Sequence, residues 1–414
     1  MTAVPPPPGA PSTPQASAGA GAARGSIVAD ATAPAIVMGV LASLVGFASS
    51  FAVVLAGLRA VGASPSEAAS GLTAATLAMG IGGLVLSLWT RQPVAVAWST
   101  PGAALLATAA MPSGGFGAAV GAFVTCGVAL ALTALLRPLA RAVAAIPVPI
   151  ASAMLAGILL ELTLAPVRAV AADWRLGLPI ALAWLLGGRL HRLLAVPAAL
   201  AAFVAVLLIG IELPPDVGER LAASLGFALV PTAPRFEWSA IVGIALPLYV
   251  VTMAGQNIPG LAVLRANGFE PSAPRAFAVT GALSAAAASF GGHAVNLAAI
   301  TAAMCAGSEA GDDPARRYWA GAVSGLVYVL LAAVAGTAAL FVSLAPPILI
   351  EAVAGLALIG SFAGAALAAF SDARAREAAA VTFLVSASGI AVLGVSGAFW
   401  GLLAGLAVYA LARR

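Results

Sequence analysis

The sequence contains no lysine and very little charge of either sign. Only 8% of its 414 residues are charged, and all 19 positive charges are arginines, whereas an ordinary soluble domain has about 25% charged residues. The arginines stand singly or in pairs, which excludes the clustered basic face that nucleic-acid binding requires. The two cysteines, Cys126 and Cys305, offer no disulfide framework and are predicted to pack as small residues. We expect neither a metal site nor a cofactor.

Apolar residues dominate what is present. They make up 62% of the chain, and a helix needs about 20 of them in succession to cross a bilayer. This composition predicts an all-α polytopic membrane protein. An intramembrane enzyme such as a prenyl transferase would need clustered aspartates near a membrane face, and Asp312-Asp313 is the only pair, so we do not expect an enzyme. Residues 1–30 are rich in Pro and Ala, so we expect a disordered cytoplasmic tail. They lack the charged leader and apolar run of a cleaved signal peptide.

The apolar segments fall into two sets of seven. The first repeat covers residues 31–211, a polar connection covers 212–238, and the second repeat covers 239–414. The predicted segments lie at about 35–58, 66–89, 94–110, 115–136, 147–164, 176–188 and 193–211, and then at about 240–263, 273–290, 293–306, 316–343, 346–369, 374–393 and 397–412.

The two halves are related in sequence. Residues 58–66 (LRAVGASPS) share six of nine positions with residues 264–272 (LRANGFEPS), and Pro149 with Gly157 corresponds to Pro347 with Gly355. An odd number of segments per half places the copies in opposite orientations, which predicts fourteen transmembrane segments as two inverted repeats. With both termini cytoplasmic, fourteen arginines lie inside and five outside, as the positive-inside rule expects; the five are Arg59, Arg168, Arg175, Arg220 and Arg235.

The third segment of each half begins with an extended, β-branched stretch. In the first half Ser99, Thr100 and Pro101 follow it, and a hydroxyl residue before proline is typical of a helix start. We therefore expect a half-helix from Thr100 or Pro101 within the membrane, and a second one in the tenth segment with Asn296 as its N-cap. Their positive ends and free N–H groups would meet at one place and could bind a carboxylate. Ordinary helices kinked at Pro101 are the alternative.

The eighth segment supplies polar side chains. Tyr249, Thr252 and Gln256 are spaced i, i+3 and i+7, so we expect them on one helix face with Asn257 beside them. An unpaired amide in lipid costs several kcal/mol, so this face should meet protein or a cavity. Gln256 and Asn257 could instead join helices to one another.

Few titratable groups lie in the apolar segments. His293 precedes the tenth segment's extended stretch and could relay a proton, or it could be a structural histidine at a boundary. Glu161 and Glu351 lie near helix ends, where acids can reach water. Asp312 and Asp313 are predicted to be solvated in a loop.

Three motifs resemble the benzoate:proton symporter family (BenE type). They are residues 98–106 (WSTPGAALL), 252–265 (TMAGQNIPGLAVLR) and 292–303 (GHAVNLAAITAA). The resemblance covers residues 31–412 and implies the fold of uracil/xanthine permeases and sulfate-type anion transporters. In that fold a core domain, segments 1–4 and 8–11, moves against a gate domain, segments 5–7 and 12–14, often within a homodimer in the inner membrane.

The resemblance also implies import of a small aromatic carboxylate, such as benzoate, together with protons. The carboxylate would lie between Thr100/Pro101 and Asn296, with Gln256 orienting it and Trp98 or Tyr249 near the ring. A nucleobase or inorganic-anion transporter on the same fold is the alternative. A nucleobase permease is expected to carry a glutamate on segment 8, and no acid occurs between Trp238 and Glu270.

Overall fold

The computed structural model describes residues 30–412 except for 137, 139–140, 142–144, 192–193, 211–213 and 393–394. The predicted tail therefore lies outside the described residues, apart from Asp30. A helix or a strand–helix pair lies at each of the predicted apolar ranges. The polar connection contains the short helix α10.

The helices of the first half are α1 (Ala33–Ala48), α2 (Phe51–Ala60), α3 (Pro65–Thr90), α4 (Thr100–Thr108), α5 (Gly115–Thr133), α7 (Val148–Ala172), α8 (Trp174–Leu190) and α9 (Ala195–Gly210), followed by α10 (Val217–Ala223). Those of the second half are α11 (Trp238–Ala240), α12 (Leu246–Thr252), α13 (Ile258–Ala266), α14 (Ala273–Ala288), α15 (Ile300–Ala306), α16 (Tyr318–Ser343), α17 (Pro347–Phe370), α18 (Arg376–Ala387) and α19 (Gly397–Ala412). Two π-helical turns, η3 (Ile241–Ala245) and η4 (Met253–Asn257), join α11, α12 and α13, and two 3₁₀ turns, η5 (Ser308–Ala310) and η6 (Pro314–Arg316), precede α16.

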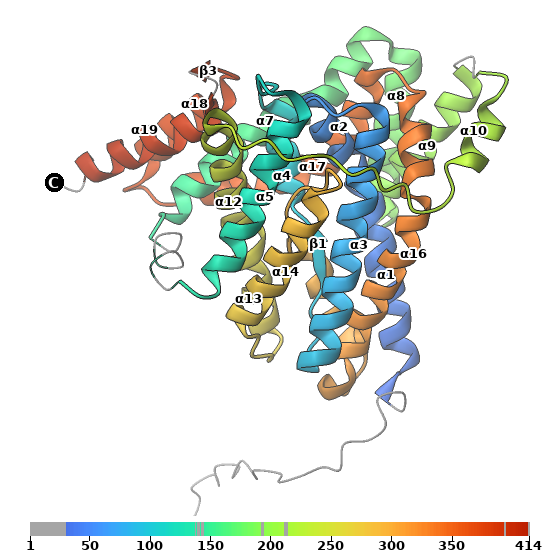
Figure 1. Ribbon diagram of the computed structural model, residues 1–414, viewed down its shortest axis with the longest axis horizontal. Helices are drawn as coiled ribbons and strands as arrows, with labels where there is room; N and C mark the ends of the chain where they lie inside the picture. Colours follow the sequence, from blue (N-terminus) through green and yellow to red (C-terminus); the bar gives the residue numbers. More distant parts are fainter. Residues whose placement is uncertain are drawn as a thin grey trace, which may run out of the picture.

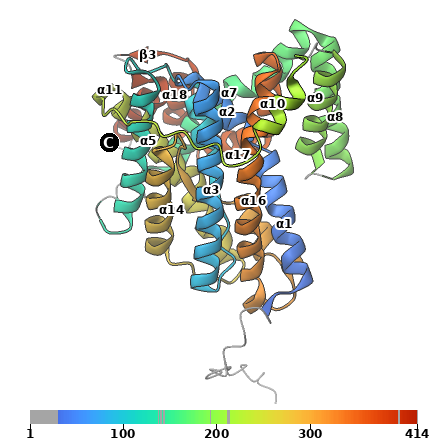
Figure 2. The ribbon, with the colours of Figure 1, turned by 45° about the vertical axis from the view of Figure 1, so that its right-hand side comes forward.

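The helices pack in two groups. In the first group α5, α14, α3, α16 and α1 stand side by side in that order, as Figures 1 and 2 show. In the second group α7 packs against both α17 and α18, α18 packs against α19, and α8 packs against α9. The pair α2 and α4 lies between the groups, because α2 also contacts α17 and α4 also contacts α7.

Two short strands cross inside the first group. Strand β1 (Val96–Trp98) pairs antiparallel with β2 (Val295–Leu297), so that Ala97 lies opposite Asn296. The ladder is buried. Pairing of the two strands gives hydrogen-bond partners to backbone N–H and C=O groups that lipid could not bond. Because α4 follows β1 and α15 follows β2, the pairing places two short helices at the ends of one buried ladder. A second, two-residue ladder joins β3 (Ala391–Val392) to β4 (Val395–Ser396).

The duplicated sequence forms the same turn twice. Gly62 and Gly268 both have positive φ, of 100° and 84°, a conformation that glycine adopts at little cost. In each copy the residue after the glycine donates its N–H over 3.0 Å to the carbonyl of a leucine, Leu58 or Leu264. This is the bonding of a helix ended by a left-handed glycine, so the sequence match has a structural counterpart.

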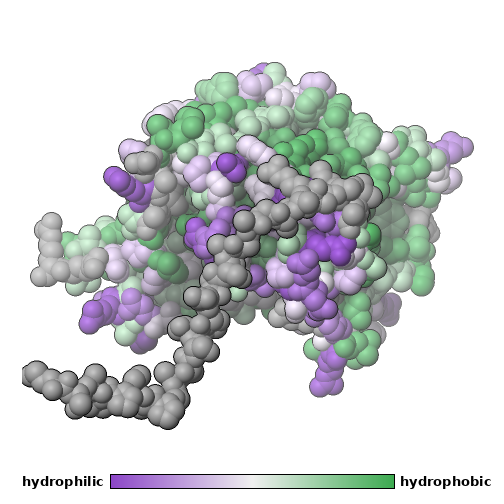
Figure 3. Space-filling model, turned by 90° about the horizontal axis from the view of Figure 1, so that it is seen from below, coloured by the Kyte–Doolittle hydropathy of each residue, from purple (hydrophilic) through white to green (hydrophobic). Residues whose placement is uncertain are grey.

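The surface and the helix lengths suit a bilayer. Seven helical stretches among the described residues are long and apolar enough to cross a membrane, and large side chains such as Leu330 and Leu367 are 64% and 75% exposed. In the view from below, apolar side chains cover the upper part of the outline and hydrophilic ones gather in its central and lower part (Figure 3). The chain is therefore a multi-pass membrane protein; a count of fourteen spans stays a prediction.

Candidate functional site

Ser99 fixes the start of α4. As predicted, the helix begins at Thr100 with Pro101 in its first turn, but the N-cap is Ser99, whose Oγ accepts the N–H of Gly102 at 3.1 Å. The same Oγ accepts the hydroxyl of Thr252 at 2.8 Å, and the Ser99 N–H donates to the Ala294 carbonyl. Ser99 is thus fully bonded, and in α4 only Thr100 keeps an N–H without a partner among the described residues.

The second predicted cap is wrong. Asn296 lies inside β2, where its Nδ2 donates to the Leu297 carbonyl at 2.8 Å, and α15 begins four residues later with Ala299 as a cap that makes no side-chain bond. The extended stretch continues further than the sequence suggests because the ladder to β1 holds it. The N–H groups of Ile300 and Thr301, in the first turn of α15, consequently have no partner among the described residues.

The π turn η4 separates the polar side chains of the eighth segment. Tyr249 bonds Thr133 of α5 at 2.6 Å, whereas Thr252 bonds Ser99. The Gln256 side chain forms no hydrogen bond with a described residue. The i, i+3, i+7 spacing assumed a regular α-helix, whereas the wider π turn η4 lies between Thr252 and Ile258 and shifts the helix phase.

Asn257 has a structural role. Its Oδ1 accepts the N–H of Leu297 at 2.9 Å, and its Nδ2 contacts the sulfur of Met253 at 3.2 Å. The side chain is fully buried. Asn257 therefore ties the eighth segment to the end of β2, which is the interhelical role that the sequence left open for it.

A central cavity of about 70 Å³ lies between the starts of α4 and α15. Its walls come from α1, the end of β1, η4, the first turns of α4 and α15, and α16. The lining residues are Val45, Gly46, Ser49, Ser50, Met79, Ala97, Trp98, Thr100, Gln256, Ala298, Ala299, Ile300, Thr301 and Tyr328. Of the predicted site residues, the structure brings Trp98, Thr100 and Gln256 to this cavity.

Unsatisfied polar atoms line the central cavity. The hydroxyls of Thr301 and Tyr328 are buried and have no hydrogen-bond partner among the described residues. A Cβ added at Gly46 would collide with the Tyr328 hydroxyl, so glycine at this position makes room for it. Buried polar groups are normally bonded, and these two together with Gln256 offer donors to a bound molecule.

Trp98 forms a fixed wall of the central cavity. Its indole N–H donates to Ser50 Oγ at 2.8 Å, and its ring lies 5.5 Å from that of Phe47 at an interplanar angle of 54°. Ser50 stands at the break between α1 and α2. Because the indole N–H is already bonded to Ser50, Trp98 can offer only its ring to a molecule in the cavity.

His293 lies behind Ser99 rather than in the cavity wall. It is fully buried, and its Nε2 lies 3.2 Å from the Ser99 carbonyl. A carbonyl only accepts, so Nε2 carries the proton in this bond. Nδ1 has no partner among the described residues, which leaves a buried acceptor next to the start of α4.

Comparison with known proteins identifies the family. A model described as benzoate membrane transport protein (BenE) matches residues 29–411. The chain belongs to this family. As a BenE protein it is 37% identical over 380 residues to the inner membrane protein YdcO of Escherichia coli (strain K12), with 91% of this chain and 95% of YdcO covered. It is 31% identical over 378 residues to a benzoate membrane transport protein of Acinetobacter baylyi, with 91% and 94% covered.

Solved structures show the same fold in anion transporters. This BenE chain superposes on SLC26A9 with a TM-score of 0.62 at 13% identity, covering 91% of this chain and 65% of that one. It superposes on the transmembrane domain of the cyanobacterial bicarbonate transporter BicA with a TM-score of 0.53 at 16% identity, covering 91% and 96%. The fold and the family together make the chain a membrane transporter, not an enzyme.

Proposed function

We propose that this chain imports benzoate or a similar small aromatic carboxylate together with protons. One observation carries the proposal: the central cavity is lined both by neutral hydrogen-bond donors without partners among the described residues and by the indole ring of Trp98. Among the described residues no charged side chain lines this cavity, so a carboxylate there would be bound by Gln256, Thr301, Tyr328 and the free N–H groups of the two helix starts. Hydrogen bonds to a charged partner are worth about 1.5–3 kcal/mol each.

The aromatic ring is the second half of the proposal. Trp98 offers a buried ring face, and Met79 lines the same cavity. Offset or edge-to-face ring contacts add about 0.5–1.5 kcal/mol beyond the burial of area. The descriptions of the family and of the Acinetobacter baylyi relative as benzoate membrane transport proteins support the same substrate class. A nucleobase ring that carries its own N–H donors would find no carboxylate acceptor among the described residues that line this cavity.

Transport would follow from two helix groups that move against each other. We propose the core domain as the group of α1–α5 and α11–α16, and the gate domain as α7–α9 and α17–α19, within two inverted seven-segment repeats. The antiparallel ladder between β1 and β2, each followed by a short helix, supports this symmetry. The repeated turns at Gly62 and Gly268 support the duplication. Cytoplasmic termini and a homodimer belong to the same proposal.

Uptake into proteoliposomes tests the proposed function. Labelled benzoate, uracil and sulfate should be offered in parallel, each with and without an inward proton gradient. Concentrative uptake of benzoate alone, lost when the gradient is collapsed, is the expected result. Uptake of uracil or sulfate in preference to benzoate, or benzoate uptake that follows sodium instead of protons, would contradict it. Equilibration without concentration would indicate a channel.

Substitution of His293 tests the proton step separately. We expect His293→Gln to lose pH-gradient-driven accumulation while still exchanging labelled for unlabelled benzoate, because exchange needs no net proton movement. Gln can keep the bond to the Ser99 carbonyl but cannot bind a proton at neutral pH. Wild-type accumulation in this variant would assign His293 a purely structural role.

A further inference from the structure

A second, larger cavity lies between the two helix groups. It has a volume of about 380 Å³ and is lined by four charged side chains, Arg59, Glu161, Arg168 and Glu351, and otherwise mostly by apolar ones. Arg59 comes from α2, whereas the other three come from α7 and α17. We call it the charged cavity. Neither the ladder nor the unpartnered hydroxyls of the central cavity belong to it.

The charged cavity and the central cavity lie at opposite ends of the same two helices. Ser50, just before α2, and Thr100, at the start of α4, line the central cavity. Arg59 and Thr108, near the ends of these helices, line the charged one. Nine residues of helix span roughly 12 Å. A molecule that moved along α2 and α4 would therefore meet both cavities in turn.

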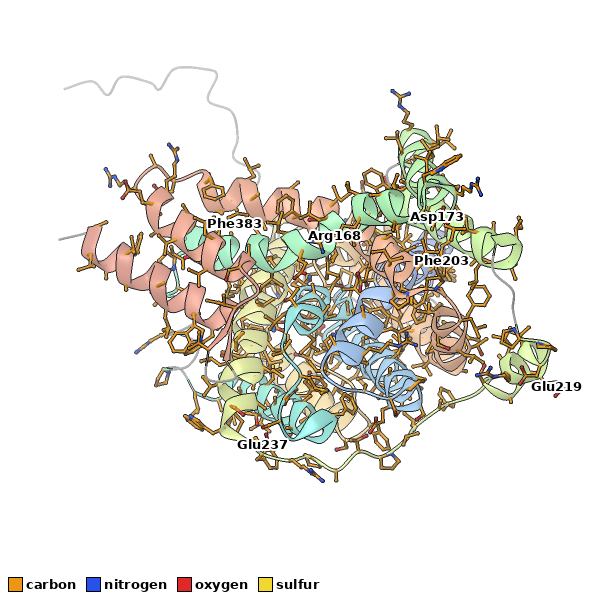
Figure 4. The ribbon with its side chains drawn as sticks, turned by 90° about the horizontal axis from the view of Figure 1, so that it is seen from above. Arg168, Asp173, Phe203, Glu219, Glu237 and Phe383 are labelled. Atoms are coloured by element: carbon orange, nitrogen blue, oxygen red, sulfur yellow. The ribbon has the colours of Figure 1, made fainter. Side chains whose placement is uncertain are left out.

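Two charged side chains of this cavity, Arg59 and Glu351, form no ion pair with a described residue. Arg168, labelled on α7 in Figure 4, lies 3.7 Å from Glu161, and both side chains are more than half exposed. The Arg59 side chain is partly buried, and its guanidinium forms no hydrogen bond or ion pair with a described residue. A guanidinium held among apolar walls favours a planar anion that it can bind through two parallel hydrogen bonds.

The walls define what kind of anion fits. Leu55, Leu162 and Ile350 line the same cavity as Arg59, so the site pairs one cationic fork with apolar surface. A small carboxylate with an apolar body matches both features, whereas a sulfate or a sugar would leave the apolar walls unused. Glu351 on the facing helix would repel the bound carboxylate, which makes the site a place of passage rather than of tight retention.

We propose that Arg59 forms an accessory carboxylate site in the charged cavity, where an aromatic carboxylate binds before or after it occupies the central cavity. The inference rests on the proposed function, because it takes the same substrate class. Two molecules should then bind per chain at saturation, one that depends on Gln256 and one that depends on Arg59.

Equilibrium dialysis of labelled benzoate against the purified full chain in nanodiscs tests this site. We expect two molecules per wild-type chain and one per Arg59→Gln chain, with Arg59→Lys keeping the second molecule at an affinity at least several-fold weaker. Gln256→Ala should keep the Arg59-dependent molecule. Arg175→Gln, an arginine on α8 outside the cavity, should keep both. If Arg59→Gln fails to fold, Ala107→Leu narrows the same cavity from α4 and should remove the same molecule.

One molecule per wild-type chain, bound unchanged by Arg59→Gln or Ala107→Leu, would overturn the accessory site and leave the proposed function intact. A wild-type chain that neither binds nor transports benzoate would overturn both. Loss of both molecules in Arg59→Gln, with an unchanged melting temperature, would also count against two separate sites.

Discussion

Gln256 and Asn257 are neighbours in the chain with different surroundings. Gln256 lines the central cavity without a partner, whereas Asn257 is fully buried and accepts the N–H of Leu297. Gln256→Ala should weaken benzoate binding about tenfold or more while the melting temperature stays unchanged, because one hydrogen bond to a charged group is lost. Asn257→Ala should instead destabilise the fold by about 1–3 kcal/mol, since it leaves a buried N–H unsatisfied.

Binding and thermal unfolding of the two purified variants separate these roles. Asn257→Ala is the control for Gln256→Ala, because both residues lie in η4. A loss of benzoate binding caused by general damage to η4 would therefore appear in both variants. Equal loss of stability in both, or unchanged benzoate binding by folded Gln256→Ala, would place the carboxylate elsewhere.

Tyr328 carries a buried hydroxyl that bonds no described residue. Tyr328→Phe removes it without breaking a hydrogen bond to a described residue, so the melting temperature should stay or rise. Benzoate affinity should fall by about tenfold, as expected for one hydrogen bond to a charged partner. Tyr318→Phe is the matched control, because the Tyr318 hydroxyl bonds Asp30 away from the cavity. An equal loss of affinity in both variants would argue against a contact at Tyr328.

At the residue scale, the sequence predicted those site residues whose signal is local. Trp98, Thr100 and Gln256 stand in motifs with proline, hydroxyl or amide residues at recognisable spacing, and all three line the central cavity. Tyr328 lies in none of the three motifs, and Thr301 lies in the third one without a cap or spacing signal of its own, so neither could be found in this way. The amide of Asn296 suggested a cap, but cross-strand pairing with Ala97 decided its conformation.

At the element scale, the sequence predicts turns more reliably than it predicts the orientation of side chains around a helix. The matching residues 58–66 and 264–272 predicted a repeat, and both copies form the same glycine turn. The π turn η4, which packs against β2 and α7, has no comparable sequence signal. It changes the helix phase that the i, i+3, i+7 spacing of Tyr249 and Gln256 assumed.

The repeated turn gives a prediction about conformational strain. Gly268 has positive φ and no atom within 4 Å of an added Cβ, so Gly268→Ala should destabilise the fold by about 1 kcal/mol through backbone strain alone. Gly360, inside α17, is equally open but has no positive φ. Gly360→Ala should stabilise the helix by up to about 1 kcal/mol. Melting temperatures of the two purified variants should therefore move in opposite directions; a fall in both would contradict the strain argument.

At the scale of the whole molecule, the inverted repeat is tested by the sides on which its loops lie. Fourteen spans with cytoplasmic termini place the connection around α10 outside and the loop before α16 inside. Ala223 and Asp312 are both exposed positions in these segments. The native thiols, Cys126 and Cys305, are fully buried, so replacing them with alanine leaves a background in which single introduced cysteines report alone.

We expect Ala223→Cys to react with a membrane-impermeant maleimide added to intact cells, and Asp312→Cys to react only after the membrane is opened. The physical reason is that a charged reagent cannot cross the hydrocarbon core, so reactivity reports the side of an exposed thiol. A permeant maleimide, which should label both variants in intact cells, controls for accessibility. Because a missing or added span between the two positions would put both cysteines on one side, labelling of both from outside, or of neither, would rule out the inverted seven-segment plan.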